Sequence, residues 1–190
     1  MRRHRISRLS ALALGLLLAA PLAAATLAGV TMPDKVEVGE HPLALNGMAL
    51  RSKAVFKVYV GGLYLPDRET DWKKLLSEDE PRHMVMHWVR NVDKAAICEA
   101  WKEGLEANTP NASADVKKNF DALCGMMQDA KTGDRFAFTY LPGSGVEVKV
   151  NDQSKGNLGG KPFADALFAC WIGEHPGPGE KFRDALMGVK

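Results

Sequence analysis

Arg51 and Tyr59 are the two residues of this sequence whose types and spacing could together bind an anion. Arg51 lies in an apolar, β-rich stretch between Leu45 and Leu65. Such a stretch is expected to be mostly buried, and a buried guanidinium is costly unless an anion or a hydrogen-bond network meets it. We interpret the pair as an anion clamp, in which Arg51 binds a carboxylate or phenolate and the Tyr59 hydroxyl adds a hydrogen bond. The alternative is an exposed edge-strand arginine beside a packing aromatic ring.

The spacing of these two residues sets a condition on the fold. Along one uninterrupted strand they would stand about 26 Å apart, at roughly 3.3 Å per residue. Contact therefore requires a turn near residues 52–54, which would put the two side chains on adjacent strands.

Other polar residues give weaker indications of a binding or catalytic site. His83 and His87 lie four residues apart in a strand-like segment, about 13 Å, which is too far for one metal ion to bridge. We interpret them as a polar strand face, Asp93 as a helix cap, and Arg90 as either solvated or bordering a cleft. The sequence shows no Ser-His-Asp or Cys-His constellation, no glycine-rich phosphate loop and no carboxylate pair at a catalytic spacing. We therefore expect neither a metal nor a cofactor.

The elements that must position these residues follow from hydrophobic periodicity and turn residues. Residues 26–34 are expected to be a flexible entry, Asn46-Gly47 a turn or bulge, and Gly61-Gly62 a bulge or close backbone approach. Strands are predicted at 36–38, 43–51, 55–65, 83–89, 135–141 and 146–150, and a last short strand is predicted to begin at Leu158. Helices are predicted at 72–77 after an Asp71 cap, at 93–107, from Ser113 to about 127, at 163–171 and at 180–186. This order predicts an α+β fold, an antiparallel sheet covered on one face by helices, with a ligand cleft between the layers.

The first residues have the pattern of a secretory signal. Four arginines precede an apolar run from Leu9 to Ala20, and Ala23-Ala24-Ala25 supplies a cleavage site before Thr26. Removing residues 1–25 takes away four arginines and no acid, so the net charge changes from +2 to −2. We therefore expect one domain at residues 26–190, periplasmic or secreted, with no nucleic-acid partner and no stable membrane insertion after signal removal.

Three cysteines remain after the signal: Cys98, Cys124 and Cys170. An oxidising compartment permits a disulfide, and Cys98 with Cys124 could join two neighbouring helices. Three buried thiols acting as small hydrophobic residues are an equal alternative.

Two blocks of sequence resemble the chalcone isomerase superfamily, specifically its bacterial chalcone-isomerase-like branch. The first comprises Gly47-Met-Ala-Leu-Arg51 and Phe56-Lys-Val-Tyr59-Val-Gly-Gly-Leu-Tyr64, and the second runs from Ala166 to Glu174. The resemblance implies an open-faced β-sandwich. It places Arg51 on the strand arginine that stabilises enolate charge in the plant enzymes, Tyr59 where those enzymes carry a threonine, and Cys170 near their serine or threonine.

The sequence leaves three functions open, two of which the resemblance implies. A tyrosine at position 59 beside Arg51 resembles the non-catalytic fatty-acid-binding relatives. We therefore expect a periplasmic binding protein for a fatty acid or similar apolar carboxylate, with Arg51, Tyr59, Tyr64 and Cys170 as ligand-binding residues. The first alternative is a chalcone-isomerase-type intramolecular lyase acting on a phenolic enone, with Arg51 as the catalytic group. The second is a structural or adaptor protein of the cell envelope.

Overall fold

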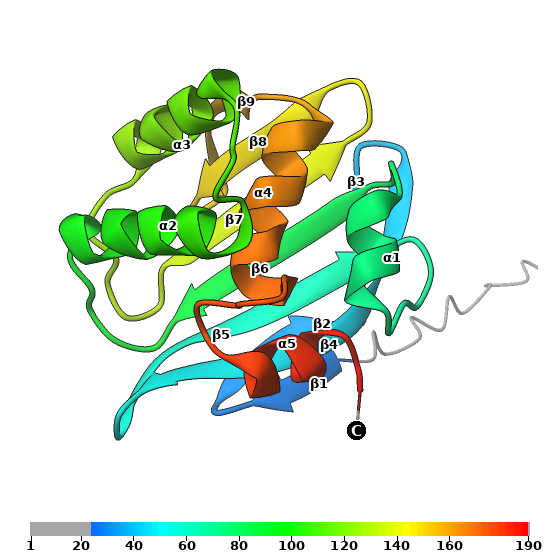
Figure 1. The fold of residues 1–190 in the computed structure, drawn as a ribbon. Coiled ribbons are helices and arrows are strands. Elements are labelled where there is room, and N and C mark those ends of the chain that lie inside the picture. The colour runs from blue at the N-terminus through cyan, green and yellow to red at the C-terminus, as the bar shows by residue number, and fades with distance from the viewer. Residues whose placement is uncertain (1–23, 190) are drawn as a thin grey trace, which may run out of the picture.

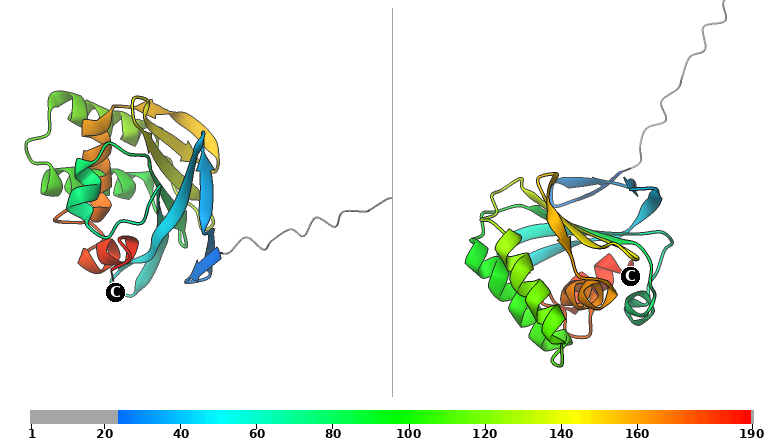
Figure 2. Two further views of the ribbon diagram at one scale, coloured as in Figure 1. Left: turned by 90° about the vertical axis from the view of Figure 1, so that its right-hand side faces the viewer. Right: turned by 90° about the horizontal axis from the view of Figure 1, so that it is seen from above.

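Seven antiparallel strands form one curled sheet in which each strand pairs with its neighbour along the chain. The computed structural model describes residues 24–189, so the signal segment predicted at 1–25 lies almost wholly outside the described residues. In sheet order the strands are β3 (Lys35–Val38), β4 (His41–Lys53), β5 (Phe56–Leu65), β6 (Arg82–Trp88), β7 (Arg135–Leu141), β8 (Gly145–Val150) and β9 (Gln153–Leu158). Figure 1 and the left view of Figure 2 show helices covering one face of this sheet. The predicted α+β architecture is confirmed.

The helical layer packs around one central, almost wholly apolar helix. Its members are α1 (Trp72–Ser77), α2 (Lys94–Asn108), α3 (Ala114–Met126), α4 (Lys161–Ile172) and α5 (Glu180–Leu186). Helix α4 lies across the middle of the sheet and contacts each of the other four helices (Figure 1). Because it has neighbours on all sides, α4 buries nearly every residue after its first turn, whereas α2 and α3 bury single stripes at helical spacing. None of the helices within residues 24–189 is long and apolar enough to cross a membrane.

The segment before the sheet is a hairpin, and the prediction of a flexible entry at 26–34 is wrong. Strands β1 (Ala24–Leu27) and β2 (Val30–Pro33) pair with each other, and the predicted cleavage point before Thr26 falls inside β1. Val30 and Met32 pack on Val60, on the sheet face away from the helices (Figure 2, right). This hairpin therefore shields the outer face of β4 and β5 from water.

The predicted helix caps are confirmed at two positions and corrected at a third. Asp71 accepts hydrogen bonds from the backbone N–H groups of Lys73 and Lys74, and Ser113 accepts one from Val116. Asp93 occupies the N-cap position of α2, but its side chain makes no capping hydrogen bond. The carboxylate of Asp129 accepts from the Lys94 N–H instead, at 2.8 Å.

The last strand also differs from the prediction. Leu158 ends β9, whereas the sequence pattern made it the start of a strand. Residues 153–157 are polar because β9 is an edge strand with most of its side chains in water, so they carry no hydrophobic alternation for a sequence pattern to detect.

A bulge at Asn46 joins the sheet to the C-terminal helix. The register of β4 against β5 shifts between Leu45 and Gly47. The Asn46 amide donates to the carbonyl oxygens of Glu69 and Leu186, at 2.9 Å each. A Cβ atom at Gly47 would lie 2.2 Å from the carbonyl oxygen of Ala185, so only glycine fits this approach. The predicted irregularity at Asn46-Gly47 is thus a bulge that holds α5 against β4.

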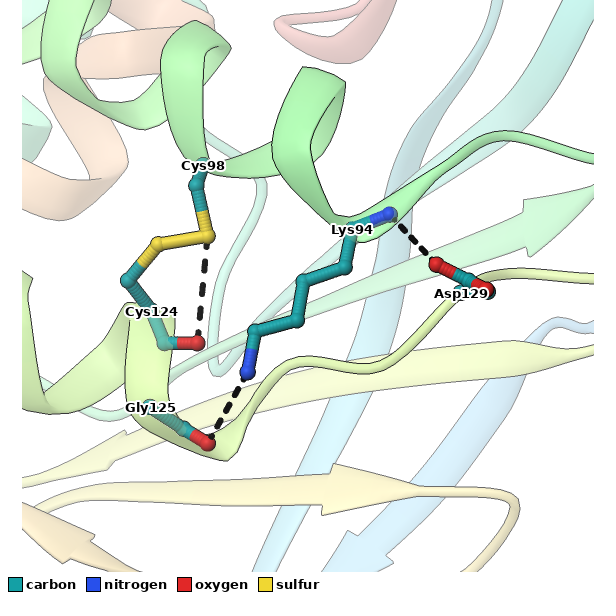
Figure 3. The surroundings of a disulfide bond; sticks show 5 residues. All are labelled: Lys94, Cys98, Cys124, Gly125 and Asp129. Atoms are coloured by element: carbon teal, nitrogen blue, oxygen red, sulfur yellow. Dashed lines mark hydrogen bonds between the residues drawn. A yellow bond between two sulfur atoms is a disulfide. The ribbon is translucent and has the colours of Figure 1, made fainter.

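Helices α2 and α3 are linked covalently. A disulfide joins Cys98 to Cys124, with their Cα atoms 5.4 Å apart (Figure 3). Next to it, the Lys94 ammonium donates to the Gly125 carbonyl oxygen at the end of α3. The first turns of α2 are therefore bound both to the end of α3 and, through Asp129, to the loop that follows α3.

Candidate ligand-binding site

Arg51 and Tyr59 lie directly opposite each other on adjacent strands, as their proposed contact requires. The chain turns at Ala54 and Val55, and the register of β4 and β5 pairs Arg51 with Tyr59. Tyr59 in turn pairs with Trp88 of β6. Residues paired across strands share a face, so these three side chains stand side by side on the face that carries the helices.

A cavity of about 420 Å³ opens over these side chains. Its floor is the inner face of the sheet, one wall is α2, and the rest is the end of α4 with the loop that follows. The residues that line it include Arg51, Lys53, Val58, Tyr59, Met86 and Trp88 from the sheet, Ile97, Glu99, Ala100, Trp101, Glu103 and Gly104 from α2, and Cys170, Trp171, His175, Gly177 and Pro178 from α4 and its loop. This volume and this mostly apolar lining are typical of sites for small organic ligands.

Arg51 and Lys53 are the arginine and lysine that line this cavity, and Arg51 has no acidic partner among residues 24–189. It is half-buried, and its Nη1 donates to the carbonyl oxygen of Pro178 at 3.1 Å. Glu99 and Glu103 of α2 also line the cavity but form no ion pair with Arg51 in the described part of the chain. A guanidinium has several N–H donors, so Arg51 keeps the capacity to bind an anion that enters the cavity.

Tyr59 supplies a neutral hydroxyl beside that cation. Its ring is buried and meets the rings of Trp88 and Phe182 edge-on. Burial raises the pKa of the Tyr59 hydroxyl far above its ordinary value, and the nearby Trp171 indole and Arg51 guanidinium offset this only in part. The phenol therefore keeps its proton at neutral pH and can donate it in a hydrogen bond to a carboxylate.

Cys170 also lines the cavity, as an unreactive wall residue. Its thiol donates to the Ala166 carbonyl oxygen at 3.4 Å, and burial raises its pKa to about 12. The sulfur lies only 2.7 Å from the place that a Cβ atom of residue 104 would occupy, so the glycine there lets α2 approach α4 closely. A protonated, buried thiol of this kind behaves as a small hydrophobic residue.

Tyr64 is not in the cavity, and its assignment to the ligand site is corrected here. It lies five residues after Tyr59, and an odd separation along a strand puts it on the opposite face. There its hydroxyl donates to the Pro33 carbonyl oxygen at 3.0 Å, and its ring packs near His83. Tyr64 therefore holds the N-terminal hairpin.

Sequence reasoning missed the wall that α2 and the α4–α5 loop provide. Ile97, Trp101 and Leu105 were recognisable as one helical face, but nothing in their spacing says which strand residues that face meets. The loop residues Gly177 and Pro178 belong to a turn-rich stretch that carried no site signal. Arg90, considered as a cleft residue, lies over the Phe56 ring at 4.5 Å instead.

A second arginine, Arg82, is completely buried in the fold. Its side chain is 0% exposed and donates to Asp165 of α4 and to the Glu78 carbonyl oxygen, each at 2.8 Å. The guanidinium also lies over the rings of Tyr140 and Phe168. The feature of the sequence that points to a buried ion pair is Asp165, a lone acid within the apolar run from Phe163 to Ile172. Arg82 and Asp165 are thus a structural ion pair, separate from the cavity.

His83 and His87 lie on the sheet face away from the helices, which is polar only in part, because Val85 and Val89 pack there against the cluster of Val30, Met32 and Val60. Residues 24–189 contain no group of three or more His, Cys, Asp or Glu residues placed to hold a metal ion. His83 Nδ1 lies 2.7 Å from the Thr139 hydroxyl, and burial lowers the His83 pKa to about 4.

This lowered pKa predicts a loss of stability in mild acid. The unfolded chain takes up a proton at His83 near its ordinary pKa, about 6.5, whereas the folded chain does so only near pH 4. The free energy of unfolding should therefore fall as the pH drops from about 6.5 towards about 4. Urea titrations across this range should show a smaller decline for His83→Gln. An equal decline in both proteins would show that other groups control the acid response.

Comparison with known proteins agrees with this architecture. Residues 24–188 match the family model described as chalcone isomerase-like. A crystal structure of a fatty-acid binding protein of Arabidopsis thaliana superposes with a TM-score of 0.70 at 15% sequence identity, and the match covers 88% of this chain and 97% of that chain. No curated protein matches the sequence. At this identity the Arabidopsis structure shows a shared fold.

Proposed function

This chain belongs to the chalcone isomerase-like family, and from that premise we propose that it binds a fatty acid or similar apolar carboxylate without transforming it. The observation that carries the proposal is Arg51, half-buried at a mostly apolar cavity, opposite Tyr59 and with no acidic partner among the described residues. A guanidinium that is partly removed from water gains from pairing with an anion, because a charge-assisted hydrogen bond then replaces the lost hydration.

The chemistry of the cavity fits an amphiphile with one anionic end. Aromatic and aliphatic side chains of Met86, Trp88 and Ile97 offer an alkyl chain a surface away from water, and each buried methylene contributes about 0.8 kcal/mol. The carboxylate would accept hydrogen bonds from the Arg51 guanidinium and the Tyr59 hydroxyl. The Arabidopsis protein of the same fold, which is a fatty-acid binding protein, supports this choice of ligand. If residues 1–25 act as an export signal, the binding takes place in the periplasm or outside the cell.

Replacing Arg51 by Gln tests the proposal directly. We expect palmitate affinity, measured by isothermal titration calorimetry on protein that lacks the predicted signal segment, to fall about 10- to 100-fold, because a charged hydrogen bond to the carboxylate is lost. Arg135→Gln is the matched control, since Arg135 is an exposed strand arginine paired with Asp152 away from the cavity. That variant should bind palmitate as the wild type does.

Two further measurements separate the alternatives. Methyl palmitate has no carboxylate, so its affinity should be low and should not depend on Arg51. Turnover of a chalcone by the wild type that Arg51→Gln abolishes would favour the isomerase. Wild-type protein that neither binds palmitate nor acts on a chalcone would favour the envelope adaptor.

A further inference from the structure

The tip of the β4–β5 hairpin exposes hydrophobic side chains that the fold does not use. Val55 is 87% exposed and Phe56 is 56% exposed, and they are two of the three exposed large hydrophobic residues in the described part of the chain. The pairing of β5 with β6 begins only at Tyr59, so residues 52–57 extend beyond the neighbouring strand. In Figure 1 they form the cyan projection at the lower left.

Cations surround this apolar tip. The segments 51–58 and 87–92 contain Arg51, Lys53, Lys57 and Arg90 and no Asp or Glu. None of these four forms an ion pair with an acid within residues 24–189. Arg90 lies over the Phe56 ring, so a positive charge sits directly beside the exposed aromatic side chain. Because residues 26–190 carry a net charge of −2, this local excess of positive charge contrasts with the rest of the domain.

We propose that residues 52–57 dock on the surface of a bilayer that contains anionic lipid. Val55 and Phe56 would enter the boundary between headgroups and acyl chains, and Lys53, Lys57 and Arg90 would lie among the lipid phosphates. A protein partner fits less well, because two side chains cannot supply the roughly 800 Å² per partner that a stable protein interface buries. Shallow insertion into a bilayer needs only an apolar pair and neighbouring cations.

The position of this tip relates docking to the cavity. Arg51 and Lys53 line the cavity and also belong to the arms of the same hairpin. A docked tip would therefore hold the cavity close to the bilayer, where fatty acids partition. This step from docking to ligand entry rests on the proposed function, whereas the docking itself does not.

Vesicle flotation of protein that lacks the predicted signal segment tests the docking. The wild type should float with phosphatidylcholine vesicles that contain phosphatidylglycerol and much less with phosphatidylcholine alone. Val55→Ser/Phe56→Ser should lower the bound fraction on anionic vesicles about 10-fold, and Lys57→Gln should lower binding roughly fivefold. Val189→Ser and Lys118→Gln remove an exposed hydrophobic residue and an exposed cation elsewhere, and both should float as the wild type does.

Palmitate titration of the same variants keeps this proposal separate from the proposed function. Val55→Ser/Phe56→Ser should bind palmitate in solution as the wild type does, because neither side chain lines the cavity. The docking proposal would be overturned, even if palmitate binds, if the wild type does not float with anionic vesicles or if the double Ser variant floats in the same bound fraction as the wild type. A change in sedimentation coefficient in the double Ser variant would instead make the tip an interface between copies, and would overturn it too.

Discussion

Replacing Asp165 by Asn is expected to lower the free energy of unfolding by about 3–5 kcal/mol, because it leaves a buried guanidinium without its counter-charge. The Arg82 side chain is completely buried, and Asp165 is its acidic partner. Lys161 also binds Asp165, from one turn earlier in α4, but it cannot replace the carboxylate. Urea unfolding followed by tryptophan fluorescence measures the difference.

Two variants make this prediction specific. Asp152→Asn removes the same charge from an exposed pair with Arg135, and it should cost less than about 1 kcal/mol. The double variant Arg82→Met/Asp165→Leu should recover much of the lost stability, because no unpaired charge stays buried. If Asp165→Asn unfolds at the same urea concentration as the wild type, Arg82 is hydrated in the folded protein and the pair is not a structural requirement.

Loss of the Cys98–Cys124 disulfide is expected to lower the free energy of unfolding by about 3 kcal/mol. The bond closes a loop across a sequence separation of 26, and cross-links of this span stabilise proteins by about that amount. Thermal unfolding of Cys98→Ser/Cys124→Ser should therefore begin at a lower temperature than that of the oxidised wild type.

The reduced wild type supplies the control for this measurement. Dithiothreitol should lower the midpoint of the wild type to that of the double Ser variant and should leave the variant itself unchanged. Because residues of α2 line the cavity, palmitate should restore part of the lost stability by binding only the folded form. An oxidised wild type and a variant with equal midpoints would contradict this prediction.

Much of the fold follows from local sequence patterns. Alternation of apolar residues identifies β6, where Met84, Met86 and Trp88 face the helices, and Ser113 marks the start of α3. The spacing of Arg51 and Tyr59, with the turn that their contact needs, leads to the pairing of β4 with β5. These features are predictable because neighbouring residues along the chain determine them.

The remaining features depend on parts of the chain that meet only in the folded protein. Tyr64 was assigned from its place in a family motif, and the strand period puts it on the other face. Arg82 can be buried because Asp165, 83 residues later in the chain, pairs with it, and no pattern in the residues around Arg82 indicates that partner. In the same way, the hairpin of β1 and β2 is stabilised by Val60, which lies outside it.

The order of packing has a consequence for synthesis of the protein. All seven strands of the main sheet precede α4 in the chain, and α4 is the helix that covers the middle of that sheet. During translation, Phe136, Phe138 and Val148 therefore lack the part of their cover that α4 supplies until residues 161–172 have emerged from the ribosome. A nascent chain that ends before that point would expose apolar surface of the sheet, and we expect chaperones to bind it or proteases to degrade it.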